Sequence, residues 1–292
     1  MSSNNSSIAL RRLTSTDMDF AQRVRELAGW NQRLADWQRV LEHDPHGCFV
    51  AECAGQLAGT ATTTTYSQEL AWIGMVLVDP DMRRRGVGTA LLRHCIDHLL
   101  QTGVTCIKLD ATPMGKTVYG PLGFVVEWDL SRWGNMQVSA VTRHAVQVDA
   151  DVVPLNANEI DAVCTIDSNG FGVARDRMLS LLAAQSEVRV VRDTDGRVRG
   201  YGMLRPGAHA YYLGPIVADD VTTGTALAEA LLNEIPQRPV YWDIPDANLS
   251  AIAVAERFGL QKQRTLTRMY LGQNASPGSE SAQWAIAAPE IG

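Results

Sequence analysis

Apolar positions recur along the chain with two different spacings, and these predict alternating strands and helices. Trp72–Val78 is apolar throughout, as expected of a strand that is covered on both faces. Between Leu91 and Leu100, apolar residues recur at helical spacing and predict a helix with one buried face. The other elements predicted in this half are strands at Ile8–Leu13, Cys48–Cys53, Gln56–Tyr66, Thr105–Ala111 and from Phe124, and helices at 17–28, Asp36–Glu42 and Thr117–Leu122.

The same order of elements returns about 140 residues later. Gly59 corresponds to Gly200, and Gly123 corresponds to Gly259. The elements predicted in this second series are strands at Asp151–Leu155, Val188–Arg192, Val198–Leu204, Tyr211–Val217, Pro239–Ile244 and Leu266–Leu271, and helices at 158–164, Thr225–Ile235 and Leu249–Phe258. We therefore predict two copies of one α/β fold, with a boundary within Val138–Asp149.

The two ends of the chain differ in composition from the part between them. Residues 1–7 are rich in Ser and Asn, and residues 273–292 contain Ser, Pro, Gly and Ala, so we expect a disordered start and a flexible tail. This leaves predicted domains at 8–140 and 141–272. The chain has 292 residues, 46% of them hydrophobic, which is enough to bury a sizeable core.

Net charge and cysteine usage narrow the class of function. A net charge of −6 argues against a general nucleic-acid binder, which usually needs a basic face. No apolar run is long enough to span a bilayer, and no secretory leader pattern follows Met1, so we expect a cytoplasmic protein without a membrane partner. The five cysteines form no CxxC pair, and no His/Cys cluster has metal-ligand spacing, so we expect reduced thiols and no metal.

The strongest chemical signal is an Arg/Gly loop between the apolar strand and the helix. It reads Arg83-Arg84-Arg85-Gly86-Val87-Gly88. A helix N-terminus offers unpaired N–H groups and a positive dipole end, and glycines allow the backbone to approach a diphosphate closely. Arginine before a helix is also common in a merely solvated turn. The preceding buried strand and the following helix favour a phosphate-binding loop.

A second segment makes the pattern specific. Tyr119-Gly120-Pro121-Leu122-Gly123-Phe124 begins 31 residues after Gly88, beyond one more predicted strand. The Arg/Gly loop followed by this Y-x-x-L-G-F segment resembles the GNAT superfamily of N-acetyltransferases, and the whole chain resembles its bacterial tandem members. The resemblance implies two GNAT-like folds, each a mixed, mostly antiparallel central sheet flanked by helices, and acetyl-CoA as co-substrate. It covers nearly the whole ordered chain and is strongest in residues 72–124.

The resemblance also implies roles for individual residues. Tyr119 would protonate the departing thiolate of CoA. Thr112 stands where the family often has Asn, so one cofactor contact there is in doubt. The positions implied in cofactor binding are Val76, Leu77 and Val78 for pantetheine, Arg83, Arg84, Arg85, Gly86, Val87, Gly88 and Thr89 for pyrophosphate, and Thr112.

The general base and the acceptor site stay open at this stage. Strand Trp72–Val78 carries no carboxylate; Glu69, Asp110, His43 and His46 are candidates for the base, beside a water chain with no single base. Candidate acceptor residues are Trp30, Trp37, Asp110 and Asp243, with Tyr211, Tyr212, Trp242 and Asp246 as further possibilities. For each tryptophan, a position in the core is the more frequent alternative.

The second half departs from the family pattern at the cofactor positions. Ala255 stands where the tyrosine is expected, and Asp219–Gly224 replaces the Arg/Gly loop with two aspartates and no arginine. Two carboxylates at this place would repel a diphosphate. We therefore predict a degenerate second domain that packs against the first and shapes the acceptor pocket.

Three functions are compatible with these residues. The first is acetyl transfer to the primary amine of a small molecule. The second is a non-catalytic acyl-CoA sensor or interaction module, suggested by Thr112 and by the missing base. The third is a protein or peptide N-acetyltransferase, which would need an open groove. A homodimer is compatible with all three.

Overall fold

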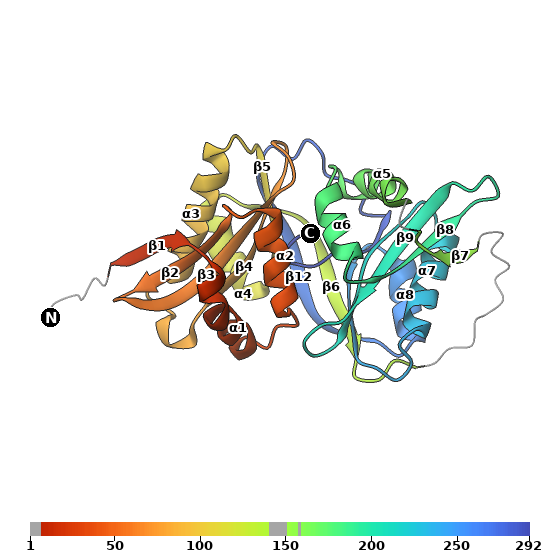
Figure 1. The fold of residues 1–292 in the computed structure, drawn as a ribbon, viewed down its shortest axis with the longest axis horizontal. Coiled ribbons are helices and arrows are strands. Elements are labelled where there is room, and N and C mark those ends of the chain that lie inside the picture. The colour runs from red at the N-terminus through yellow and green to blue at the C-terminus, as the bar shows by residue number, and fades with distance from the viewer. Residues whose placement is uncertain (1–6, 140–150, 157–158) are drawn as a thin grey trace.

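The computed structural model describes residues 7–139, 151–156 and 159–292. Two α/β halves lie side by side, the first in red to yellow and the second in green to blue (Figure 1). In the first half the strands are β1 Ile8–Arg12, β2 Cys48–Cys53, β3 Gln56–Thr65, β4 Ala71–Val78, β5 Cys106–Ala111 and β6 Val125–Asn135. Its helices are α1 Met18–Leu27, α2 Leu34–His43, α3 Val87–Gln101 and α4 Pro113–Tyr119, with short 3-10 turns at Ser15–Asp17, Pro80–Met82 and Gly120–Leu122.

The second half repeats this order. Its strands are β7 Val152–Pro154, β8 Glu187–Arg192, β9 Val198–Arg205, β10 Tyr211–Ala218, β11 Val240–Pro245, β12 Gln261–Gly272 and β13 Gln283–Ala285. Its helices are α5 Ile160–Phe171, α6 Asp176–Ala183, α7 Val221–Asn233 and α8 Leu249–Arg257. The predicted tandem α/β fold is thus confirmed, while most of the predicted boundary falls outside the described residues.

All thirteen strands of the described residues form one mixed sheet. Its order is β1-β2-β3-β4-β5-β12-β6-β11-β10-β9-β8-β7, with β13 beside β10. The halves therefore exchange strands, because β12 of the second half pairs with β5, and β6 of the first half pairs with β11. These two strands also pair with each other at the centre of the molecule (Figure 1). Neither half has a complete sheet of its own.

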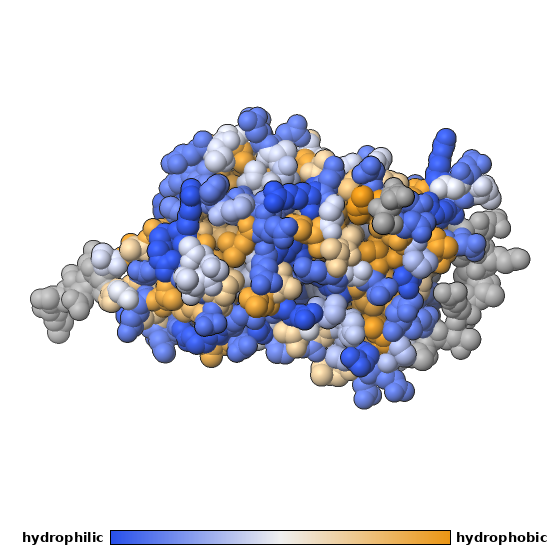
Figure 2. All heavy atoms as spheres, viewed as in Figure 1, coloured by the Kyte–Doolittle hydropathy of each residue, from blue (hydrophilic) through white to orange (hydrophobic). Residues whose placement is uncertain are grey.

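The core follows the predicted apolar faces with one exception. Leu91, Leu92, Cys95 and Leu99 of α3 are buried against the sheet, whereas Leu100 is exposed. The five cysteines are free and buried, as expected of small apolar side chains. Hydrophilic residues predominate on the face shown in Figure 2, with apolar residues interspersed among them. Among the described residues, no helix has both the length and the apolar character needed to cross a lipid bilayer.

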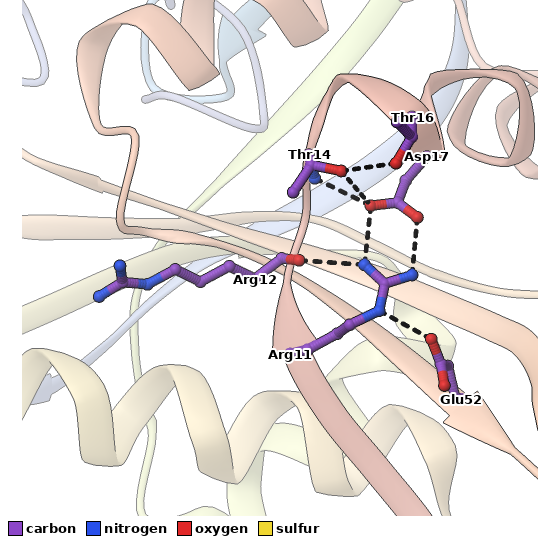
Figure 3. Close-up of polar contacts among 6 residues, drawn as sticks. All are labelled: Arg11, Arg12, Thr14, Thr16, Asp17 and Glu52. Carbon is purple, nitrogen blue, oxygen red and sulfur yellow. Dashed lines mark hydrogen bonds and ion pairs between the residues drawn. The ribbon is translucent and has the colours of Figure 1, made fainter.

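The edge strand β1 is held by a buried carboxylate. Arg11 donates two hydrogen bonds to Asp17, at 2.9 and 2.8 Å, and a third to Glu52 of β2 at 2.7 Å (Figure 3). Asp17 also accepts a hydrogen bond from the backbone N–H of Thr14 at 2.9 Å. The guanidinium of Arg11 is the main reason why the pKa of Asp17 is lowered. This network ties β1 to the start of α1.

The prediction of a flexible tail at 273–292 is wrong for its last part. Trp284, Ile286 and Ile291 are at most 2% exposed, and β13 pairs with β10. The segment ends at the centre of the molecule, between the two halves (Figure 1). All the serines of this tail lie within residues 274–281, whereas Trp284–Ile291 is apolar apart from one glutamate and is stabilised by burial.

Candidate active site

Strands β4 and β5 pair only at one end. The parallel pairing comprises Ala71 with Ile107 and Trp72 with Lys108, and β4 continues to Val78 without this partner. On its other side, β4 has an irregularity opposite β3, where Met75 adopts a φ of 48°. The bulge and the splayed strands form a gap in the sheet that opens beside Gly74, Met75 and Val76.

The Arg/Gly loop lies at the N-terminus of α3, where the sequence places it. Gly86 is the N-cap residue with a φ of 82°, and no side chain caps the helix. Within the described residues, the backbone N–H groups of Arg84–Thr89 donate no hydrogen bond. The side chains of Arg83–Arg85 are exposed. Free N–H groups, a helix dipole and adjacent guanidinium groups are the features that bind a diphosphate.

A cavity of about 100 Å³ opens at the gap between β4 and β5. Strand β4 lines it with Ile73–Val76, and β5 lines it with Leu109 and Asp110. The other walls come from β12, from the segment between α1 and α2, and from the tail. These walls contribute Arg264, Leu266, Trp30, Gln32, Pro289 and Glu290. The cavity is therefore built from both halves of the chain.

Tyr119 lines this cavity from the end of α4. Its ring packs beside Phe124, with ring centroids 6.1 Å apart, and its hydroxyl makes no hydrogen bond with the described residues. Burial raises the pKa of Tyr119 to about 12, so the phenol is protonated at neutral pH. Thr112 also lines the cavity and caps α4 by accepting a hydrogen bond from Gly115 N at 3.1 Å.

Asp110 lies at the cavity but is held by an ion pair. Arg268 of β12 donates to both carboxylate oxygens, at 2.9 and 3.0 Å, and both side chains are almost completely buried. The guanidinium lies between two indole rings, 4.5 Å from that of Trp72 and 4.1 Å from that of Trp128. Asp110 therefore ties β5 to the exchanged strand.

The other predicted acceptor residues lie at different places. Trp30 lines the cavity, but Trp37 is fully buried in the core, on the inner face of α2. Asp243 does not line the cavity; it pairs with Arg132 of β6 at 2.8 and 2.6 Å and accepts a hydrogen bond from Tyr212. Of the candidate bases, Glu69 and His46 are exposed, and His43 contacts the carbonyl of Thr65. The described residues contain no group of His, Cys, Asp or Glu suited to hold a metal ion.

Two models of acetyltransferases match the chain, one in each half. The model of the acetyltransferase (GNAT) family matches residues 10–116, and that of an acetyltransferase (GNAT) domain matches residues 163–285. Together they cover well over half of the chain. The chain belongs to the GNAT acetyltransferase family.

Relatives of similar length agree with a tandem GNAT acyltransferase. Holothin acyltransferase from Pseudoalteromonas sp. (strain SANK 73390) is 27% identical over 271 residues, which is 90% of this chain and 87% of that protein. A putative acetyltransferase from Pyrococcus horikoshii has the same fold, with a TM-score of 0.81, 22% identity and coverage of 98% and 96% of the two chains. A tandem GNAT protein from the clavulanic acid biosynthesis pathway has a TM-score of 0.62 at 15% identity, over 91% and 98%.

In the second GNAT half, the corresponding gap is filled by the tail. Strand β13 pairs with β10, and Trp242 Nε1 donates to the carbonyl of Trp284 at 2.9 Å. Trp284 lies so close to Gly224 of α7 that a side chain at position 224 would collide with the indole ring. The chain itself therefore occupies the space that stays open between β4 and β5.

The N-terminus of α7 is capped by a carboxylate, which disfavours an anion there. Asp220 caps the helix by accepting a hydrogen bond from Thr223 N at 2.8 Å. Asn248 caps α8 and donates to the carbonyl of Gln283 at 3.1 Å. Together with the buried Ala255 in place of a tyrosine, these contacts favour a degenerate second GNAT half.

Proposed function

We propose that this acyltransferase moves an acetyl group from acetyl-CoA to a primary amine of a small molecule, by direct attack in a ternary complex. The observation that carries the proposal is the cavity of the first half. It joins the gap between β4 and β5 to the phenol of Tyr119, and the second half and the tail cover its other walls. Acetyl-CoA supplies an activated acyl group, so no covalent enzyme intermediate is needed.

The residues present fit the parts of acetyl-CoA. The free N–H groups of Arg84–Thr89 and the exposed Arg83–Arg85 side chains suit its pyrophosphate. At Val76–Val78, the edge of β4 that faces the gap has no partner strand and suits pantetheine, because an unpaired strand edge has free backbone groups. Negative charge develops on the carbonyl oxygen during attack, and a backbone N–H near Val76 stabilises it. Tyr119 then donates its proton to the leaving sulfur.

The small volume of the cavity, about 100 Å³, favours a small acceptor over a protein or peptide. Arg264 and Leu266 of β12 and Pro289 of the tail form part of its walls, where a peptide would need an open groove. A relative that matches along almost the whole chain is named for acyl transfer to holothin, which supports an acyltransferase of this two-domain length.

A CoA-release assay tests this function. Purified protein is incubated with acetyl-CoA and with ethanolamine, putrescine, glucosamine, benzylamine or tyramine in turn, and free thiol is measured. We expect release above the hydrolytic background with at least one small amine and none with a ribosomal-protein N-terminal peptide. Binding of acetyl-CoA without release on any amine would instead indicate the acyl-CoA sensor. Turnover on the peptide alone would overturn the small-molecule proposal.

A further inference from the structure

The described cavity contains two carboxylates, and they differ in their partners. Both oxygens of Asp110 accept hydrogen bonds from Arg268. Glu290 accepts one side-chain hydrogen bond, from Gln32 Nε2 to Oε2 at 2.8 Å, and forms no ion pair among the described residues. Proton uptake by Asp110 would break a buried ion pair, which is strongly destabilising. Glu290 can take up a proton without this cost.

The backbone around Glu290 is fixed against β4. Trp72 Nε1 donates to the carbonyl of Pro289 at 2.9 Å, and the hydroxyl of Tyr66 donates to the carbonyl of Ile291 at 2.5 Å. Between these two anchors, the backbone of Glu290 lies on Gly74, where a Cβ would collide with it. The tail thus brings a carboxylate to the strand that carries none, one residue before the bulge at Met75.

Both titratable acids and cations surround Glu290. The acidic groups that face it are Asp36 of α2, Tyr66 after β3 and Tyr212 of β10; the cations are Arg205 of β9, Arg132 of β6 and Arg264 of β12. Its side chain is 5% exposed, and this burial is the main reason why the pKa of Glu290 is raised. Asp36 raises the pKa further, while Arg205 and Gln32 oppose the shift. A carboxylate with a raised pKa is a better base near neutral pH.

We propose that Glu290 is the general base that accepts the proton of the acceptor amine, with Gln32 as the residue that orients its carboxylate. This role rests on the function proposed for the cavity. It makes the tail part of the active site, so that the first half contributes the cofactor loop and Tyr119, and the end of the chain contributes the base.

The proton balance of the step is complete with these two residues. The acceptor enters as an ammonium ion, and Glu290 takes one proton to leave a neutral amine. The nitrogen lone pair forms the C–N bond with the acetyl carbon, and the C–S bond breaks with its electron pair on sulfur. Tyr119 gives its proton to that sulfur and regains one from the protonated amide nitrogen. Glu290 then releases its proton to solvent.

The test compares Glu290→Gln with Glu280→Gln, using the panel amine that the wild type acetylates fastest. Glu280 is a half-buried glutamate of the same tail that does not line the cavity. We expect Glu290→Gln to lower kcat about 100-fold at pH 7, in the range typical of a general base, with the KM for acetyl-CoA within about twofold of wild type. Glu280→Gln should leave both constants unchanged.

The pH profile distinguishes a base from a structural role. In the wild type, kcat should rise with pH through the raised pKa of Glu290, because only the carboxylate accepts a proton. In Glu290→Gln this rise of kcat with pH should disappear. The difference in kcat between wild type and variant should shrink as the pH approaches the pKa of the acceptor amine itself. Glu290→Asp should keep the rise of kcat with pH, at a lower kcat, since it retains the carboxylate.

Each outcome separates the role of Glu290 from the function of the cavity. Equal kcat and equal pH profiles for wild type and Glu290→Gln would overturn the role and leave the acetyltransferase function intact. If kcat of Glu290→Gln were lower than that of wild type by the same factor at every pH, and its melting temperature were also lower, the residue would have a structural role. That result would also overturn the role as base. A wild type that acetylates no amine would overturn the proposed function, and the role of Glu290 with it.

Discussion

Replacing Trp284 with alanine is expected to lower the free energy of unfolding by about 3–5 kcal/mol, the range found for removal of a buried tryptophan. Trp284 is 2% exposed, and its indole ring packs on α7 at Gly224. Its backbone carbonyl accepts a hydrogen bond from Trp242. The substitution leaves a cavity between β13 and α7 that the backbone cannot easily close. Urea unfolding followed by circular dichroism measures the change.

Met136→Ala is the matched control for this substitution. Met136 is 70% exposed, so its truncation should change the free energy of unfolding by no more than about 0.5 kcal/mol. If Trp284→Ala unfolded at the same urea concentration as Met136→Ala, the tail would not be packed in solution. The conclusion that the tail fills the gap of the second half would then lose its support.

Replacing Tyr119 with phenylalanine is expected to lower kcat about 100-fold or more, because the leaving thiolate loses its proton donor. The ring and its packing against Phe124 are kept, so the affinity for acetyl-CoA should not change. Steady-state CoA release gives kcat, and calorimetry gives the dissociation constant. A fall in kcat at constant affinity indicates an interaction made in the transition state.

Tyr270→Phe is the control for Tyr119→Phe. Tyr270 is a half-buried tyrosine of β12 that does not line the cavity, so loss of its hydroxyl should leave kcat at the wild-type value. If Tyr119→Phe turned over as fast as Tyr270→Phe, Tyr119 would have no part in proton transfer, and a water molecule would have to protonate the sulfur.

Local sequence signals were sufficient to place the Arg/Gly loop and Tyr119 within the fold. The apolar strand, the Arg/Gly loop and the amphipathic helix are contiguous in sequence, so their spacing alone places Gly86 at the N-terminus of α3. The same holds for Tyr119, which lies at the end of a short helix next to the following strand. The repeat of elements likewise predicted the tandem fold that the structure confirms.

Contacts between distant segments could not be predicted in this way. An alternating pattern defines a strand but not its partner, so it gave no sign that β6 and β12 change places between the halves. Glu290 was missed for a related reason, because its segment has too few residues to show a period and follows a polar stretch. The signals that could have found it are the absence of an acid on β4 together with one acid inside the apolar run Trp284–Ile291.

The candidate acceptor residues show the limit of residue type as evidence. Trp37 and Asp243 have the chemistry of an amine site, but one is in the core and the other is neutralised by Arg132. Trp30 and Asp110 do line the cavity, although Asp110 is paired with Arg268. Sequence gives the type of each side chain, whereas its availability depends on partners from other strands.

The most direct test of the account is the number of acetyl-CoA molecules that one chain binds. Isothermal titration of the purified protein with acetyl-CoA should give one site per chain, because α3 has a free N-terminus while α7 is capped by Asp220 and its gap is filled by β13. Exchange of Arg83–Arg85 for glutamate should abolish this binding, since the loop would then repel the pyrophosphate. Two sites per chain, or binding that survives this exchange, would contradict the assignment of the cofactor to the first half.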